Sequence, residues 1–239
     1  MASHRLMIAN FQSGVQPLSA PHRHYLINVL RLTPPATVEV FDGKGRFATA
    51  QLVFDNRGGV GLEIGAIQPQ KQTNHQLSIA MAIPKGERAD WVVEKLTEIG
   101  VYRIVWIECE RSIVNLKPNS SKYSRWLRIA EAAAKQCGRT DIPIIEAVRE
   151  FSEVTLQLAD LKFICLPNSQ PLFPHLTSLA SPQPLNSLCL IGPEGDFSQK
   201  EIALALQHEF LKVGLTCDTL RVETAAMVAA GLLLSAIWR

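Results

Sequence analysis

The sequence predicts an α/β protein with two domains, a small β-rich domain over residues 1–72 and a larger domain over residues 73–239. In the first segment, apolar and polar residues alternate around glycine-rich turns, which is typical of half-buried strands joined by hairpins. From residue 77 onward, short apolar runs alternate with segments of helical period, which indicates a mainly parallel sheet covered by helices. The polar stretch 68–76 ("QPQKQTNHQ") is predicted to link the two domains.

The N-terminal domain is predicted to contain a short helix followed by hairpins. The helix is expected over residues 22–32 ("HRHYLINVLRL"). Two strands follow within "TVEVFDGKGRFATAQLV" (37–53), separated by Asp-Gly-Lys-Gly at 42–45, which is strong hairpin chemistry. Gly58 and Gly59 mark a further turn before another strand, "VGLEI". These elements fit a small barrel.

The predicted elements of the C-terminal domain alternate between apolar strands and amphipathic helices, and glycines end two of the helices. In chain order they are a strand at 77–83, a helix at 89–99 before Gly100, a strand at 101–107, a helix at 122–137 before Gly138, and strands at 163–166 and 187–191. Ser198 and Glu201 have the spacing of a capping box, so a helix is expected to begin there.

The hydrophobic segments and the cysteine content indicate a cytoplasmic protein without a metal site. The uncharged run 224–238 has 15 residues, fewer than the roughly 20 of a membrane span, and is predicted to be a buried helix. The N-terminus "MASHRLMIAN" has no apolar core of signal-peptide length. The five cysteines form no CxxC pair, which argues against zinc and disulfides and for a reducing compartment. No Cys, His and carboxylate cluster has ligand spacing, so no metal is expected.

The charge distribution is compatible with nucleic-acid contact by the first domain. The net charge is only +2, but residues 1–72 hold seven lysines and arginines against four acidic residues, together with His4, His22 and His24. A modest basic bias in a small domain is compatible with nucleic-acid binding, although it does not establish it.

The stretch "LIGPEGDFSQKEI" (190–202) lies between a predicted strand and a predicted helix, where α/β proteins bind ligands. It lacks the GK[ST] ending of a P-loop and the GxGxxG pattern of dinucleotide-binding proteins. Two acids, Glu194 and Asp196, would repel a pyrophosphate and suit a cationic centre such as the sulfonium of S-adenosylmethionine. A tight turn without a ligand remains an equally good interpretation of these residues alone.

A second loop, "CDTLRVETAA" (217–226), places charges directly before the uncharged terminal helix. Arg221 and Glu223 directly precede a long uncharged segment, so they are unlike ordinary surface residues. The alternative is that Glu223 and Thr224 serve only as helix-capping residues.

Together, "IGPEGDFSQKEI" (191–202) and "LRVETAA" (220–226) resemble the paired C-terminal motifs of the SPOUT methyltransferases. The most similar family is the one that methylates N3 of a uridine in 16S ribosomal RNA, the small subunit methyltransferase E family. Further matches occur in order, so that the resemblance covers nearly the whole chain: "HYLINVLR" (24–31), "FDG" (41–43), "PKGERADWVVEKLTEIGV" (84–101), "ERS" (110–112) and "KQCGRTDIPII" (135–145). One departure is Asp196, where many members have a second glycine; aspartate tolerates positive φ better than most residues.

The resemblance implies a C-terminal SPOUT α/β domain with a deep trefoil knot, an N-terminal PUA-like RNA-binding β-barrel, and a homodimer that packs across the terminal helix. It also implies that three loops bind S-adenosylmethionine. The cofactor-binding residues so identified are Leu166 and Pro167 in the first loop, Ile191, Gly192, Pro193, Glu194 and Gly195 in the second, and Leu220, Arg221, Glu223, Thr224 and Ala225 in the third.

Methylation of uracil N3 requires removal of a weakly acidic proton, assisted by a base or by cations that stabilise the anion. Glu223 is the candidate base, and Arg221, Arg111 and Arg139 are the candidate cations. RNA contact, with free 16S RNA or an assembled 30S subunit, is expected from these residues: Arg23, His24, Arg31, Arg46, Lys85 and Arg88. For Lys85 and Arg88, ordinary solvated surface is the alternative.

Two other functions remain open. The first is a SPOUT ribose 2′-O-methyltransferase, which the residues Arg-Val-Glu-Thr (221–224) disfavour, because those relatives usually carry asparagine and serine in this loop. The second is a non-catalytic RNA-binding ribosome assembly factor, against which the intact ligand loops count.

Overall fold

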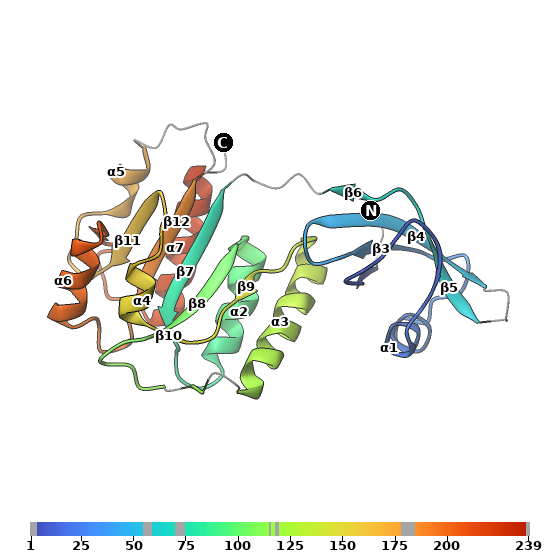
Figure 1. Cartoon of the computed structure of the whole chain (residues 1–239), viewed down its shortest axis with the longest axis horizontal. Coiled ribbons are helices and arrows are strands. Elements are labelled where there is room, and N and C mark those ends of the chain that lie inside the picture. The colour runs from blue at the N-terminus through green and yellow to red at the C-terminus, as the bar shows by residue number, and fades with distance from the viewer. Residues whose placement is uncertain are drawn as a thin grey trace. The chain divides into compact units, whose positions relative to one another are not determined.

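The computed structural model describes residues 4–54, 59–69, 75–114, 116–117, 120–177 and 185–237 (Figure 1). Contacts divide the chain into two compact units. The N-terminal unit contains residues 1–72 and also residues 134–142, and the C-terminal unit contains residues 73–133 and 143–239. The sequence analysis divided the chain at one point, and the structure adds the segment 134–142 to the N-terminal unit.

The N-terminal unit is built on a six-stranded sheet in the order β1-β3-β4-β5-β2, with β6 paired to β4. Its strands are β1 (Arg5–Met7), β2 (Gly14–Pro17), β3 (Thr37–Phe41), β4 (Arg46–Phe54), β5 (Val60–Ile64) and β6 (Gln68–Pro69). The predicted hairpin is confirmed, since β3 and β4 pair antiparallel with Phe41 opposite Phe47. Gly43 and Gly45 have φ of 76° and 99° in the turn, which glycine adopts without strain.

The predicted helix at 22–32 differs in the structure. It begins as α1 (Ala20–Arg23), capped by Ser19, continues as a π-helix, η1 (His24–Val29), and is followed by Arg31 with φ of 55°. The predicted linker is also shorter than expected. Gln68–Pro69 pairs with β4 and β7 begins at Gln76, while Gly58 and residues 70–74 lie outside the described residues.

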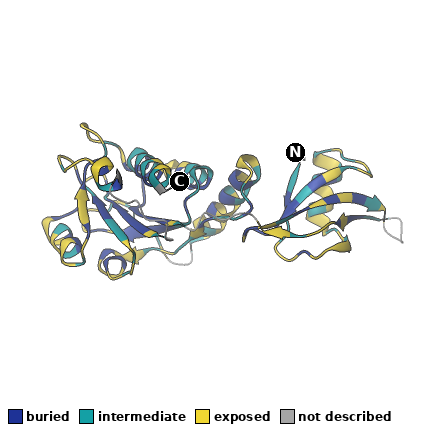
Figure 2. Cartoon of the chain, turned by 90° about the horizontal axis from the view of Figure 1, so that it is seen from above, coloured by how far each residue is buried: buried dark blue, intermediate teal, exposed yellow. Residues whose placement is uncertain are grey.

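The core of the N-terminal unit lies on one face of β4 and its neighbours, and Figure 2 shows buried residues following the strands. Alternate residues of β4, Ala48, Ala50 and Leu52, are buried. They pack with Leu26 of η1 and Leu62 of β5. The period of two predicted from the sequence therefore places one face of this strand in the core.

Asp42 holds the hairpin turn through a buried carboxylate. Its oxygens accept hydrogen bonds from the backbone N–H groups of Lys44 (2.8 Å) and Arg46 (2.9 Å) and from Arg46 Nε (2.7 Å). Burial raises the pKa of Asp42, but the bonds from Arg46 and Lys44 outweigh it and leave the pKa below its ordinary value. Because the folded-state pKa is lowered, this stabilisation is present above the unfolded pKa of about 3.9 and is lost as pH falls through the folded value.

We therefore predict that Asp42→Asn lowers the free energy of unfolding by about 1.5–3 kcal/mol at pH 7, because it removes the charge-assisted bond to Arg46. The difference from wild type should shrink when the pH falls below about 4. Chemical denaturation at pH 7 and pH 3 measures both effects. Glu63→Gln, at an exposed position of β5, is the matched control. Equal stability of the two variants at pH 7 would contradict this account.

The C-terminal unit contains a seven-stranded sheet in the order β10-β8-β7-β12-β11-β13, with β9 paired to β8. Its strands are β7 (Gln76–Ala82), β8 (Arg103–Glu108), β9 (Ile144–Ile145), β10 (Arg149–Glu150), β11 (Leu161–Cys165), β12 (Asn186–Ile191) and β13 (Leu211–Val213). Every strand pair of this sheet among the described residues is parallel, which confirms the predicted sheet type.

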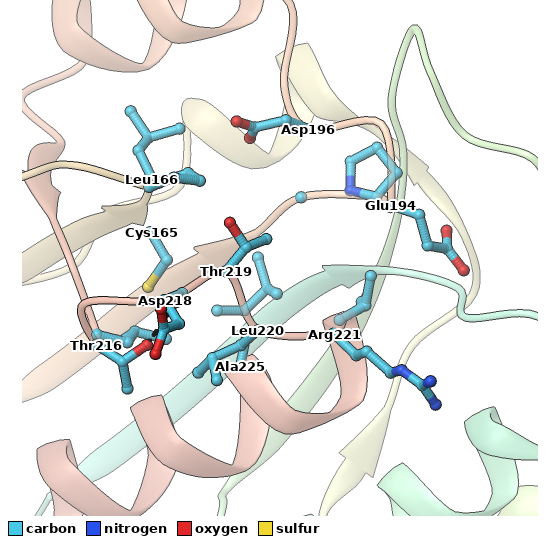
Figure 3. A pocket seen from close by; sticks show the side chains of 16 residues that line it. Cys165, Leu166, Glu194, Asp196, Thr216, Asp218, Thr219, Leu220, Arg221 and Ala225 are labelled. Atoms are coloured by element: carbon cyan, nitrogen blue, oxygen red, sulfur yellow. Dashed lines mark hydrogen bonds between the residues drawn. The ribbon is translucent and has the colours of Figure 1, made fainter.

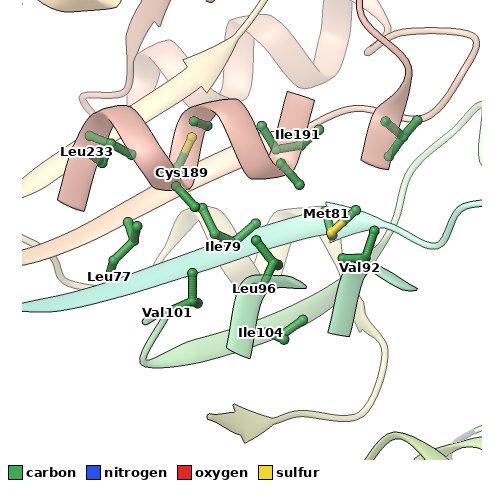
Figure 4. Packing of buried hydrophobic residues seen from close by; sticks show 14 of the residues in the cluster. Leu77, Ile79, Met81, Val92, Leu96, Val101, Ile104, Cys189, Ile191 and Leu233 are labelled. Carbon is green, nitrogen blue, oxygen red and sulfur yellow. The ribbon is translucent and has the colours of Figure 1, made fainter. Parts of the chain in front are cut away.

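Helices cover both faces of this sheet. They are α2 (Arg88–Ile99), α3 (Ser121–Cys137), α4 (Phe151–Thr155), α5 (Leu172–Thr177), α6 (Gln199–Gln207) and α7 (Val222–Ile237). Ile79 and Met81 of β7 point to the face covered by α2 and α7, as Figure 4 shows, whereas Ala80 packs in the cluster on the other face, which includes residues of α4 and α6. A central strand buried on both faces explains why its sequence is continuously apolar.

Local signals end and begin the helices as predicted. Gly100 ends α2 with φ of 108°, and Ser198 and Glu201 form both hydrogen bonds of the capping box at the start of α6. The terminal helix α7 buries Ala226, Ala230 and other small residues against the sheet. No helix in the described part of the chain is long and apolar enough to cross a membrane.

Candidate cofactor-binding and catalytic site

A pocket of about 300 Å³ opens at the carboxyl ends of β11 and β12, which is where parallel sheets bind ligands (Figure 3). Three loops form it, those after β11, after β12 and between β13 and α7. The lining residues are Cys165, Leu166 and Pro167; Ile191, Gly192, Pro193, Glu194 and Asp196; and Leu215, Thr216, Asp218, Thr219, Leu220, Arg221, Val222 and Ala225.

The first and third loops are joined by backbone contacts at Gly214. Its N–H donates to the carbonyl of Gln170 (2.7 Å), and its own carbonyl accepts from the N–H of Leu172 (3.0 Å). A Cβ atom at Gly214 would lie 2.7 Å from the carbonyl oxygen of Ser169, closer than real Cβ contacts allow. Glycine is therefore required here by the close approach of two backbones.

The second loop turns at Asp196, which has φ of 61°. The Asp196 N–H donates to the carbonyl of Pro193 (2.9 Å), and its Oδ1 accepts from the N–H of Phe197 (2.8 Å). Aspartate is among the few residues other than glycine that adopt this left-handed conformation readily. At Gly192, an added Cβ would lie 3.1 Å from the Phe197 ring, so this glycine leaves room for a buried aromatic side chain.

Arg111 supports the outer side of the second loop. Its Nη1 donates to the carbonyl of Gly195 (2.9 Å), and a Cβ at Gly195 would lie 3.3 Å from the Arg111 Cβ. The carboxylate of Glu201 ties this region together, because it accepts from the N–H groups of Glu110 (2.9 Å) and Ser198 (2.7 Å). Arg111 itself remains exposed, with its guanidinium beside the loop.

The structure places most of the predicted cofactor residues in one pocket. Those that line it are Leu166, Pro167, Ile191, Gly192, Pro193, Glu194, Leu220, Arg221 and Ala225. Gly195, Glu223 and Thr224 are not among the lining residues. Arg221 is exposed at the pocket edge, and Figure 3 shows it on the same side as Glu194, away from Cys165.

Glu223 faces a different hollow. It lies in the first turn of α7, is only 7% exposed, and its Oε1 is 3.4 Å from Nη1 of Arg88. This second hollow, of about 590 Å³, is lined by Lys85, Gly86, Glu87, Arg88, Trp91 and Glu223. The structure thus brings together one predicted catalytic residue and two predicted RNA-binding residues.

The other predicted residues lie in the N-terminal unit. Arg139 is held by Asp141, with Nη2 2.6 Å from Oδ2, and its carbonyl accepts from Arg5. Arg139 is not among the residues that line either hollow. Arg23, His24 and Arg31 are exposed on and after α1 and η1, whereas the half-exposed Arg46 is paired with the buried Asp42. Arg23 and Arg31 are therefore the more accessible cations, and the His24 side chain is exposed as well.

The sequence analysis missed four residues of the third loop that line the pocket, Leu215, Thr216, Asp218 and Thr219, and also Cys165. The Cys165 Sγ lies 3.5 Å from the Cys189 Sγ, and both are free thiols. Hydrogen bonding to Cys189, together with burial, raises the pKa of Cys165, so this thiol is uncharged at neutral pH. Among the residues that the structure describes, no group of three or more His, Cys, Asp or Glu side chains forms a metal site.

Comparison with known proteins identifies both parts of the chain. Residues 71–234 match the model of the RNA methyltransferase domain, and residues 21–64 match that of the RNA methyltransferase PUA domain. The ribosomal RNA small subunit methyltransferase E of Synechocystis sp. is 31% identical over 95% of this chain and 76% of its own length. The chain belongs to the ribosomal RNA small subunit methyltransferase E family.

Further relatives and solved structures agree with this assignment. The Bacillus subtilis member is 27% identical over 86% of this chain and 84% of its own length. The Neisseria gonorrhoeae member, solved bound to S-adenosyl methionine, matches with a TM-score of 0.84 and 26% identity over 97% of both chains. A Legionella pneumophila methyltransferase structure with bound cofactor SAM matches with a TM-score of 0.83 and 30% identity, also over 97% of both chains.

Proposed function

We propose that the protein transfers a methyl group from S-adenosylmethionine to N3 of a uridine in the 16S ribosomal RNA of the small ribosomal subunit. The observation that carries this proposal is the three-loop pocket at the carboxyl ends of β11 and β12. It occurs in a chain whose methyltransferase E relative from Neisseria gonorrhoeae was solved with this cofactor over nearly the same length.

The residues of the pocket fit S-adenosylmethionine chemically. Leu166, Ile191 and Leu220 provide apolar surface for an adenine ring. Glu194 and Asp196 provide carboxylates for the positively charged end of the cofactor. The volume of about 300 Å³ lies at the lower end of the range for small-molecule pockets. When bound, the cofactor supplies an electrophilic methyl group.

Proton removal is assigned to Glu223, and stabilisation of the resulting uracil anion to arginines. Arg221 stands at the edge of the pocket, and Arg111 supports its second loop from outside. Cations placed where negative charge develops lower the barrier most in a water-poor site. The proposal relies on Arg221 and Arg111 more than on Arg139, whose guanidinium is occupied by Asp141.

The proposal includes a trefoil knot in the C-terminal unit, closure of the N-terminal sheet into a PUA-like barrel, and a homodimer that packs through α7. The strand order supports a crossed path, because β13 lies beside β11 whereas β12, which precedes it in the chain, lies on the other side of β11. Half-exposed apolar residues on α7, among them Met227, Leu232 and Leu234, support a dimer interface. RNA contact is assigned to Arg23, His24, Arg31 and Arg46, with 16S RNA or the 30S subunit as partner.

Methyl transfer to purified 30S subunits that lack the modification tests this function. Nucleoside mass spectrometry should detect 3-methyluridine only when protein and S-adenosylmethionine are both present, and a chelator should not change the yield. Appearance of a 2′-O-methyl nucleoside instead would overturn the N3 assignment. Cofactor binding by calorimetry without any methyl transfer would favour the assembly-factor alternative.

A further inference from the structure

Adjacent residues at the start of α7 line two different hollows. Arg221 and Val222 line the candidate cofactor pocket, and the adjacent residue Glu223 lines the second hollow. The start of α7 is therefore a wall that the two hollows share. The other walls come from the loop after β7 and the first turns of α2, all in the C-terminal unit.

An exposed tryptophan forms part of the second hollow. Trp91 of α2 is 43% exposed, whereas Trp106 and Trp126 are completely buried. Exposing a tryptophan leaves a large apolar ring in water, and this ring lies beside the cations of Lys85 and Arg88. An aromatic face beside cations is the usual arrangement for stacking an unpaired RNA base while its backbone is held electrostatically.

The polar groups of the hollow complement the pairing edge of uracil. That edge has an N3–H donor between two carbonyl acceptors, whereas cytosine has an acceptor at N3. Glu223 offers a carboxylate acceptor, and Arg88 offers N–H donors 3.4 Å away. Lys85 adds a further exposed cation and makes no ion pair within the described part of the chain. The carboxylate would accept from uracil N3–H and would repel the N3 lone pair of cytosine.

We propose that this second hollow binds the target uracil, with the base stacked on Trp91 and its N3–H facing Glu223, and that the Arg88–Glu223 pair selects uracil over cytosine. The proposal rests on the proposed function, since it names the substrate subsite of the same reaction. It gives Trp91 a role in base binding and gives Arg88 a role in reading the base rather than only in contacting phosphate.

The first test compares Trp91→Ala, Trp91→Phe and the control Phe173→Ala, which removes an exposed aromatic side chain from α5. Loss of one stacked base costs about 1–3 kcal/mol, so kcat/KM for methylation of 30S subunits should fall roughly 5- to 150-fold in Trp91→Ala. Trp91→Phe should recover most of the activity. The dissociation constant for S-adenosylmethionine and the thermal midpoint should match wild type in all three variants.

The outcomes separate the two proposals. If wild type yields no 3-methyluridine, the proposed function fails. If wild type is active and Trp91→Ala is equally active, the base subsite is overturned. A parallel loss of cofactor affinity in Trp91→Ala would also overturn it, because the residue would then act on the cofactor pocket.

The second test addresses base selection with oligonucleotide probes. Oligouridylate should quench the tryptophan fluorescence of wild type at lower concentration than oligocytidylate, and Trp91→Phe should lose most of the quenching. In Glu223→Gln, whose amide can donate as well as accept, the preference for oligouridylate should decrease or disappear. Equal affinity of wild type for the two probes would overturn the assignment of the Arg88–Glu223 pair.

Discussion

Replacing Gly214 by alanine should reduce the affinity for S-adenosylmethionine by at least about tenfold, which corresponds to about 1.4 kcal/mol. The added Cβ would lie 2.7 Å from the carbonyl oxygen of Ser169, which is backbone and cannot rotate away. The loop after β11 must then move from the loop before α7, breaking the hydrogen bonds between Gly214 and residues Gln170 and Leu172. Since both of these loops line the pocket, the pocket should lose its shape before the sheet unfolds.

Calorimetric titration with the cofactor, at a temperature where circular dichroism shows the variant folded, measures this effect. Gly231→Ala is the matched control, because an added Cβ at this exposed position of α7 meets nothing within 4 Å. That control should bind the cofactor as wild type does and gain roughly 0.5–1 kcal/mol of stability from its helical position. Wild-type affinity in Gly214→Ala would contradict the assignment of the pocket.

The second large effect concerns RNA affinity. Replacing Arg23, His24 and Arg31 together by glutamine should raise KM for 30S subunits at least about tenfold and leave cofactor affinity unchanged. The slope of log affinity against log salt should decrease by roughly 0.7–0.9 for each phosphate contact that is lost. Arg46 is left in place because its pairing with Asp42 stabilises the hairpin, so its removal would mix folding with binding.

Lys200→Gln with Lys212→Gln is the matched control, since it removes two exposed cations from the C-terminal unit. Methylation kinetics and salt titrations are measured on the triple variant and on this double variant, and their KM values and salt slopes are compared. If the control loses RNA affinity as strongly as the triple variant, net charge rather than the N-terminal surface governs binding.

Substitution is a cleaner test of the N-terminal surface than removal of residues 1–72. Residues 134–142 pack within the N-terminal unit, where Arg5 Nη1 donates to the carbonyls of Ala134 (2.8 Å) and Arg139 (2.9 Å). A fragment that begins at residue 73 would keep this segment and lose its partners. Truncation would therefore mix the loss of RNA contacts with the loss of these packing contacts.

Sequence patterns predicted the long elements of the C-terminal unit well, because a helix such as α2 has many periodic positions and a buried strand such as β7 is a continuous apolar run. They missed β13 (Leu211–Val213) and α5 (Leu172–Thr177), which are too short for a period to be recognised. Because β13 was not predicted, the pocket-lining residues that follow it, such as Leu215 and Thr216, were not predicted either. β13 forms by pairing with β11, which is distant in sequence, so no local pattern marks it.

The sequence predicted which loops form the candidate site, but not the directions in which their side chains point. Arg221 and Glu223 are two positions apart at the start of a helix, so their side chains point to different sides. One lines the cofactor pocket and the other the hollow with Arg88. Propensity likewise could not reveal the π-helix at His24–Val29, whose hydrogen-bond spacing depends on how η1 packs on the sheet.

The parallel pairing of β7 with β12 has a consequence for synthesis of the chain. The start of β12 is joined to the start of β7 across 110 positions, by bonds such as that from the Leu185 N–H to His75 Nδ1. The central strand of the larger sheet therefore remains without this neighbour until most of the chain has been translated. Contacts between such distant segments make folding slow and leave apolar strands exposed meanwhile. A nascent chain stalled before residue 186 should thus need chaperone protection, and the pocket should form only late in synthesis, after β12, β13 and α7 have all emerged.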